Sequence, residues 1–160
     1  MNNSPPKKSA SGYRFTDRLV LHSRAQTPAG FYIACEPYLT LPRDATAEEV
    51  GRAVQSVLNG FRADIPQPSN FKQNTADFIR GVGAKSQKKL QESSIFCSIR
   101  EQDGKLEFIP YHNGGTSGDS QGFQPIAGAK ILLASDSALN EIGIALFKSF
   151  ALCTTIYEHF

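Results

Sequence analysis

The chain has 160 residues, of which 40% are hydrophobic and 20% charged, and this balance excludes a disordered protein because it supplies enough apolar side chains for one core. The formal net charge is +2, from 17 basic and 15 acidic residues, which neither indicates nor excludes a nucleic-acid partner. No stretch reaches the roughly 18 apolar residues that a membrane helix needs.

The first residues and the cysteines indicate where the protein works. Residues 1–12 are rich in Asn, Ser, Pro, Lys and Gly and lack the apolar run of a secretory signal, so we expect a disordered tail there and a single domain over residues 13–160. Cys35, Cys97 and Cys153 are far apart in the sequence and have no Cys-x-x-Cys spacing. We expect buried free thiols and therefore a cytoplasmic protein.

Two segments near the start predict a β-hairpin. Residues 13–23 and 31–41 contain bulky side chains that favour strands, and Pro28 and Gly30 lie in the turn between them. Pro37 cannot donate a hydrogen bond to a neighbouring strand, so we expect the second strand at a sheet edge or with a bulge.

A helix is predicted over residues 47–62. Thr46 and Glu49 form a capping box, in which the threonine hydroxyl accepts a hydrogen bond from the Glu49 amide. Behind this box, apolar residues follow at helical spacing: Val50, Ala53, Val54, Val57, Leu58 and Phe61. Residues 64–70 contain two prolines and predict a loop.

The next segment, residues 71–90, predicts a short helix that ends near Gly81 or Gly83. A basic stretch follows, with Lys85, Lys88 and Lys89. We favour a solvated, mobile connection there over an anion-binding patch.

The second half of the chain predicts another hairpin and a buried helix. Residues 94–100 and 105–111 alternate in polarity around an Asp103-Gly104 turn, and residues 112–122 predict a flexible, glycine-rich loop. A short strand is expected over residues 129–134. After it, Ser135 or Asp136 is expected to cap a final helix that runs to about Cys153 and is apolar on nearly every face.

The two long predicted helices share an opening pattern, with Gly51 followed by Ala53 and Gly143 followed by Ala145. A glycine inside a helix costs about 1 kcal/mol relative to alanine, so two matched glycines predict close packing. The alternative is coincidence in a short pattern. We expect an α+β fold of antiparallel β-sheet with packed helices, in two pseudo-repeated sheet-plus-helix halves, by analogy with Whirly-type proteins.

No motif supports catalysis. The three histidines are His22 on a predicted strand, His112 in the glycine-rich loop and His159 near the end of the chain, and none has an identifiable catalytic partner. Nucleophile elbows, phosphate-binding loops and metal-ligand clusters are absent from the sequence. We therefore expect a binding protein with no catalytic, cofactor-binding or metal-binding residues.

The sequence resembles the immunity proteins of bacterial contact-dependent growth inhibition systems. The resemblance lies in Leu41–Val54 (LPRDATAEEVGRAV), continues through Leu58–Arg62 and returns in Glu141–Leu146, so that it covers most of the chain from Tyr13 to Cys153. It implies a cytoplasmic protein that binds the C-terminal toxin domain of its cognate secreted effector and blocks it. Many such toxins are nucleases that often cut transfer RNA, so the resemblance implies a protein–protein complex without a membrane or direct nucleic-acid partner.

An inhibitor of a basic nuclease is expected to present acidic side chains. The candidates for toxin binding lie on the second predicted hairpin and in the following loop: Glu101, Asp103, Glu107, Tyr111, His112 and Asp119. The alternative for each is a solvated surface residue.

Two other functions stay open at this point. The first is a single-stranded nucleic-acid-binding protein, which would use Lys85, Lys88, Lys89 and exposed aromatic residues. The second is a small ribonuclease that would use His112 with a carboxylate.

Overall fold

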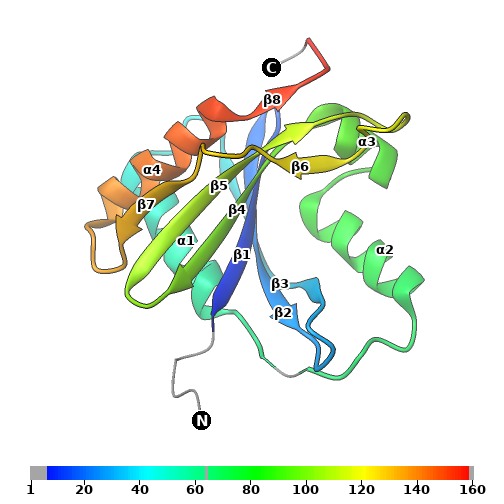
Figure 1. The fold of residues 1–160 in the computed structure, drawn as a ribbon, viewed down its shortest axis with the longest axis horizontal. Coiled ribbons are helices and arrows are strands. Elements are labelled where there is room, and N and C mark those ends of the chain that lie inside the picture. The colour runs from blue at the N-terminus through cyan, green and yellow to red at the C-terminus, as the bar shows by residue number, and fades with distance from the viewer. Residues whose placement is uncertain (1–6, 64, 159–160) are drawn as a thin grey trace.

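The computed structural model describes residues 7–63 and 65–158 and contains one twisted, largely antiparallel sheet with helices on both sides (Figure 1). The strands are β1 (Lys8–Arg14), β2 (Arg18–Gln26), β3 (Tyr32–Pro42), β4 (Ile95–Gln102), β5 (Lys105–Asn113), β6 (Phe123–Pro125), β7 (Ile131–Ala134) and β8 (Thr154–Thr155). The helices are α1 (Ala47–Asn59), α2 (Phe71–Val82), α3 (Gln87–Ser93) and α4 (Leu139–Leu152). No helix in this part of the chain is long and apolar enough to cross a membrane.

The order of the strands divides the sheet into two similar halves. β1 and β4 pair at the centre, and the order outward is β2 and β3 on one side and β5 and then β6 or β7 on the other. The strand β3 leads into α1 and β7 leads into α4, so each half is a small antiparallel sheet followed by a helix. The predicted α+β class is confirmed. The Whirly-like analogy is not, because all eight strands join one sheet.

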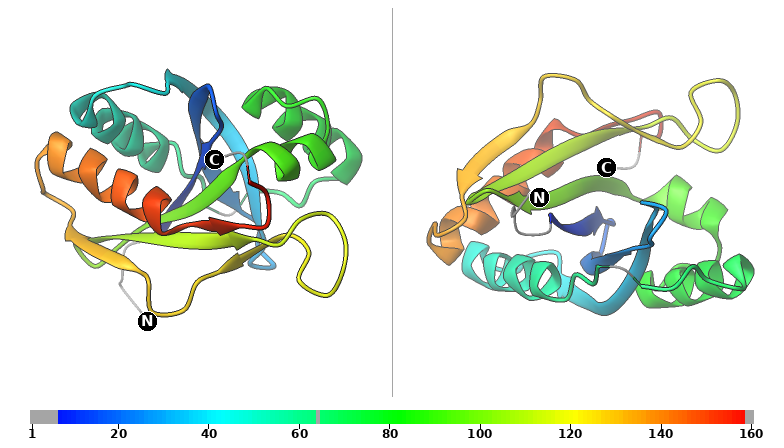
Figure 2. Two further views of the ribbon diagram at one scale, coloured as in Figure 1. Left: turned by 90° about the horizontal axis from the view of Figure 1, so that it is seen from above. Right: turned by 60° about the horizontal axis from the view of Figure 1, so that its bottom comes forward.

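Close packing of α1 on α4 explains the paired glycines. A Cβ atom on Gly51 would lie 1.9 Å from the carbonyl oxygen of Leu139, and one on Gly143 would lie 1.9 Å from the carbonyl oxygen of Ala47. Each glycine thus meets the first residue of the opposite helix. The packing predicted from the repeated pattern is confirmed, and it holds both helices against the same face of the sheet (Figure 2).

The expected disordered tail over residues 1–12 is wrong for its second half. Lys8–Arg14 form β1, the strand at the centre of the sheet, and Ala10 is fully buried. Small residues at this place leave room for larger neighbours, as where the ring of Phe150 lies close over Gly12. The composition of this segment is that of a linker, but its position between two paired strands places it in the core. Residues 1–6 lie outside the described part of the chain.

The first hairpin also differs in its bounds. The strand expected over residues 13–23 is broken by a turn after β1, so that β1 and β2 form one hairpin and β2 and β3 the next. The expectation for Pro37 is confirmed, because β3 is an edge strand with a bulge. The pairing partner changes there from Tyr38, opposite His22, to Cys35, opposite Ser23.

Local signals along the chain are largely confirmed. The Thr46 hydroxyl accepts a hydrogen bond from the Glu49 amide at 3.2 Å, and Gly83 ends α2 in a left-handed conformation. Asp103 and Gly104 both have positive φ angles, as the turn of a two-residue hairpin requires. The three cysteines are free thiols as expected, but only Cys97 is buried, whereas Cys35 and Cys153 are partly exposed. The sulfur atoms of Cys97 and Cys153 lie 3.7 Å apart.

Three expectations about the helices are wrong. The basic stretch is not a mobile connection, because Lys88 and Lys89 lie on α3 and both approach Glu92. The final helix begins after Ala138, which offers no side-chain cap, instead of after Ser135 or Asp136. Its outer face is not buried: Ile144 and Leu152 are 42% and 46% exposed.

Candidate functional site

The face of the sheet opposite α1 and α4, here called the open face, is only partly covered. Successive side chains of a strand point to opposite faces of the sheet. Leu19, Leu21 and Ile99 therefore face α1 and α4, and the residues before and after each of them in the strand face the other side. At one end of the open face, α2 and α3 pack over a second apolar cluster around Tyr13, Phe96 and their neighbours. Both views of Figure 2 show α2 and α3 together, apart from α1 and α4. No other helix of the described residues covers the open face (Figure 2).

Arg24 is the central charged residue of the open face. Its Nε donates a hydrogen bond to the Ser11 hydroxyl at 2.7 Å, and Nη1 donates to the hydroxyls of Ser9 and Ser98 at 3.2 and 3.4 Å. The guanidinium carbon lies 5.5 Å from the centre of the Phe96 ring. Burial lowers the pKa of Arg24 from its ordinary value. This is a half-buried cation held by neutral oxygen atoms.

No carboxylate of the described residues forms an ion pair with Arg24. Within residues 7–63 and 65–158, none of the ion pairs involves Arg24. Further along the sheet, Arg100 of β4 adds a second positive charge. Glu107 of β5 lies opposite Arg100 and approaches Lys130 at 3.6 Å, so that the three cations outnumber this carboxylate. The open face is therefore positively charged around Arg24.

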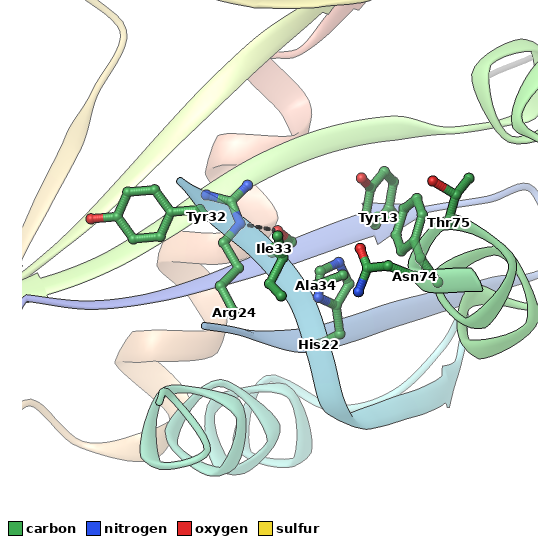
Figure 3. Close-up of a pocket in the computed structure, with 10 residues that line it drawn as sticks. Tyr13, His22, Arg24, Tyr32, Ile33, Ala34, Asn74 and Thr75 are labelled. Atoms are coloured by element: carbon green, nitrogen blue, oxygen red, sulfur yellow. Dashed lines mark hydrogen bonds between the residues drawn. The ribbon is translucent and has the colours of Figure 1, made fainter. Parts of the chain in front are cut away.

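A cavity of about 370 Å³ lies beside Arg24, between the sheet and α2 (Figure 3). The sheet provides one wall, with Tyr13, His22 and Arg24, and α2 provides the other, with Asn74 and Thr75. Tyr32, Ile33 and Ala34 of the edge strand β3 close one side. The cavity thus combines apolar walls with a cation and several hydrogen-bonding groups, as binding pockets commonly do.

His22 lies on the floor of this cavity and is only 2% exposed. Its Nδ1 lies 2.8 Å from the Ser23 carbonyl oxygen and donates to it, which leaves Nε2 as an acceptor. Nε2 is buried and has no hydrogen-bond partner among the described residues. The ring is surrounded by those of Tyr13, Tyr38 and Phe78, and burial lowers its pKa to about 4. His22 is therefore neutral near pH 7.

A second cavity, of about 850 Å³, lies between α3 and the loop of residues 114–122. It shares Tyr13 and Phe78 with the first cavity, so the two form neighbouring parts of one depression. Asn113, which is fully buried, anchors the start of this loop through its side-chain hydrogen bonds. Its side chain bonds to Gln91 in both directions at 2.6 Å, donates to the Ser94 carbonyl and accepts from the Gly115 amide. The expectation of a loop starting at residue 112 is wrong there, because β5 extends to Asn113.

The acidic residues predicted to bind a toxin are spread over different surfaces. Glu101 is on the α1 side of the sheet, 3.8 Å from Lys8, and Asp103 is exposed in the β4–β5 turn. Glu107 lies on the open face, and Asp119 is exposed in the loop of residues 114–122. The structure brings no two of these carboxylates together at one point.

The two uncharged candidates lie at the far end of β5. Tyr111 is half-buried and packs on Phe96, with ring centres 4.6 Å apart. His112 contacts β8 through a 2.7 Å hydrogen bond between Nδ1 and the Thr154 hydroxyl. No group of three or more His, Cys, Asp or Glu side chains suited to a metal ion occurs in the described ranges. His159 lies outside them.

Comparison with known proteins gives a family and a fold. A family model described as CDI immunity protein (CdiI) matches residues 40–153. No curated protein matches the sequence significantly.

Two solved structures have a similar fold, each with a TM-score of 0.74. The first is a protein of unknown function from Neisseria meningitidis, at 17% identity over 96% of this chain and 99% of that one. The second is a chain of a CdiA-CT/CdiI toxin and immunity complex from Yersinia pseudotuberculosis, at 14% identity over 95% of this chain and all of that one. At these identities the similarity establishes the fold.

Proposed function

Because the chain belongs to the CDI immunity protein family, we propose that it binds the C-terminal toxin domain of a cognate contact-dependent growth inhibition effector and neutralises it. The observation that carries the proposal is the family match over residues 40–153. The similar fold in a toxin and immunity complex supports it. On this proposal the protein acts by occupying the toxin's surface and catalyses no reaction itself.

The open face supports a protein partner. Arginine and tyrosine are common among the residues that dominate binding energy at protein interfaces, and here Arg24 and Tyr32 lie side by side at the cavity. Further exposed apolar side chains occur at its margins, with Phe31 62% and Leu132 52% exposed. Covering these side chains with another protein would remove apolar surface from water.

The activity of the toxin is a finer proposal. We expect a nuclease, with transfer RNA as one substrate class, and a neutralising complex that forms in the cytoplasm of the producing cell. Acidic side chains would steer a basic nuclease toward the inhibitor, and Asp103, at the exposed tip of the β4–β5 hairpin, is the best placed for this. Glu101, Glu107, Tyr111, His112 and Asp119 are the other proposed contacts. Because Glu101 and Glu107 lie on opposite sides of the sheet, one toxin surface would meet both only by covering the edge of the β4–β5 hairpin.

The experiment is co-expression of this chain with the C-terminal domain of the effector encoded beside it. We expect the pair to purify as a stable complex and the cells to survive, whereas the toxin domain alone stops growth. Transfer RNA from the cells, separated on a gel, then reports whether the toxin is a nuclease. Absence of a complex together with continued growth arrest would refute the immunity function, and intact transfer RNA would refute only the nuclease type.

A charge reversal tests the acidic contacts. We expect Asp103→Lys to slow association with a basic toxin domain several-fold at low salt, because steering acts mainly on the association rate. The matched control is Asp44→Lys, an equal change of charge at an exposed site that precedes α1. Equal association rates for the two variants would remove Asp103 from the contact surface.

A further inference from the structure

We propose that Arg24 is the receptor for a carboxylate side chain of the toxin domain, which enters the cavity between the sheet and α2. The inference rests on the proposed function and names the chemistry of its central contact. Its starting point is the open-face cation that no described carboxylate compensates.

The hydrogen bonds of Arg24 leave one side of the guanidinium for a ligand. A guanidinium has five N–H donors. The bonds to Ser11, Ser9 and Ser98 use Nε and Nη1, and no hydrogen bond from Nη2 occurs within the described residues. The serines therefore fix the plane of the group and leave Nη2 without an acceptor. A carboxylate matches the two free N–H groups of Nη2 in charge, and such charge-assisted hydrogen bonds are stronger than neutral ones.

Energetics favour an anion at this place. Burial removes part of the hydration of the Arg24 guanidinium, which raises its free energy. Hydrogen bonds to neutral hydroxyls offset less of this increase than an ion pair would. The neighbouring Arg100 raises this cost further because it is a like charge. A carboxylate would offset both effects, and it would gain strength because the partner protein excludes water from the pair.

The remainder of the cavity can hold the rest of an acidic side chain. Asn74 and Thr75 of α2 offer an amide and a hydroxyl that can donate to a carboxylate oxygen. Figure 3 shows the Arg24 guanidinium between Tyr32 and the group of His22, Tyr13 and Asn74. At about 370 Å³, the cavity is at the small end of ligand pockets, which suits a single side chain.

Exposed aromatic residues near the cavity favour a protein over a free anion as the source of the carboxylate. Phe31, just before β3, and Tyr32, its first residue, are 62% and 38% exposed, and Phe71, the first residue of α2, is 56% exposed. A small anion would leave these rings in water, whereas a protein that inserts one acidic side chain would cover them as well. Such an arrangement, with a charged contact inside an aromatic border, is typical of binding hot spots.

The test measures the affinity of purified Arg24→Gln and Arg24→Lys for the toxin domain. We expect Arg24→Gln to weaken binding by at least about 30-fold. Arg24→Lys should weaken it less, because lysine keeps the positive charge but lacks the planar N–H groups that the serines hold in place. The matched control is Arg52→Gln, the same loss of charge on the exposed side of α1, which should change affinity less than about 3-fold. Thermal unfolding of each variant verifies that it is folded.

A mutant cycle separates a direct contact from a structural role of Arg24. Each Asp and Glu of the toxin domain is replaced by Asn or Gln and tested against the wild-type protein and Arg24→Gln. We expect one toxin substitution to weaken binding to the wild type strongly and to add little in the Arg24→Gln background. If no acidic residue behaves in this way, or if both Arg24 variants bind as the wild type does, the inference is wrong.

Two further outcomes have distinct meanings. If the wild-type protein does not bind the toxin domain, the proposed function fails, and this inference falls with it. Titration of the free protein with inorganic phosphate and with acetate, followed by the NMR signals of the arginine Nε–H groups, tests the competing source. Micromolar binding of phosphate that Arg24→Gln abolishes would identify a free phosphate-bearing ligand and overturn the assignment to a toxin carboxylate.

Discussion

Replacing Gly143 by alanine tests the crossing of α1 and α4 directly. The new Cβ would lie 1.9 Å from the carbonyl oxygen of Ala47 and 2.6 Å from its carbonyl carbon. Real Cβ contacts stay above 3.0 Å. The clashing atoms belong to the backbone of Ala47, which cannot adopt another rotamer as a flexible side chain can. The helices would therefore have to move apart by about 1 Å or more.

The magnitude follows from two opposing effects. Alanine is favoured over glycine inside a helix by about 1 kcal/mol, which would raise the free energy of unfolding. Against this, a gap of 0.5–1 Å forfeits roughly a quarter to a half of each van der Waals contact, and overpacking of a core costs about 1–3 kcal/mol or more. The separated surface includes Val50, Val54, Ile142 and Leu146, all fully buried. We expect a net loss of about 2–3 kcal/mol.

Urea unfolding followed by circular dichroism measures this loss. The control is Ser56→Ala, an exposed change to alanine in α1, which should leave stability equal or slightly higher. Gly51→Ala should resemble Gly143→Ala, because its Cβ would meet the Leu139 carbonyl oxygen at the same 1.9 Å. The double variant should lose less than the sum, since one separation relieves both clashes. A Gly143→Ala protein as stable as the wild type would refute the reasoning.

Three further predictions concern stability. Asn113→Ala should lower the free energy of unfolding by about 2–4 kcal/mol, since it leaves several buried backbone and side-chain groups unpaired; urea unfolding measures this, and a loss below 1 kcal/mol would contradict it. Burial lowers the pKa of His22 to about 4 in the folded state, against about 6.5 in the unfolded chain, so the wild type should lose up to about 3 kcal/mol of its free energy of unfolding as the pH falls from 6.5 toward 4. Urea unfolding at several pH values measures this loss. A His22→Gln variant whose stability depends on pH as that of the wild type does would contradict the prediction. Thr46→Ala should cost about 1 kcal/mol through the lost cap of α1, whereas Thr46→Ser should retain most of it, as thermal unfolding can verify.

Features that depend on a few neighbouring residues could be predicted from the sequence. The Thr46 cap, the Asp103-Gly104 turn and the edge position of Pro37 each follow from the stereochemistry of one or two residues. The paired glycines also correctly predicted close packing, because a glycine within a helix needs a packing reason. Only the structure identified their partners: each glycine meets the other helix, and the two helices begin 92 residues apart. The family resemblance lies in this same region of the chain.

The central position of β1 and the surroundings of Arg24 could be known only from the tertiary structure. The segment Ser9–Gly12 has the composition of a linker, and its burial comes from strands that follow it in the sequence. Arg24 meets Ser9, Ser11 and Ser98 only because β2, β1 and β4 pair in one register, and a shift of one residue would send its side chain to the opposite face. Capping and turn formation are local and carry their own free energy, whereas strand register is fixed by the burial of the whole core. The cation on the open face is therefore a property of the assembled sheet.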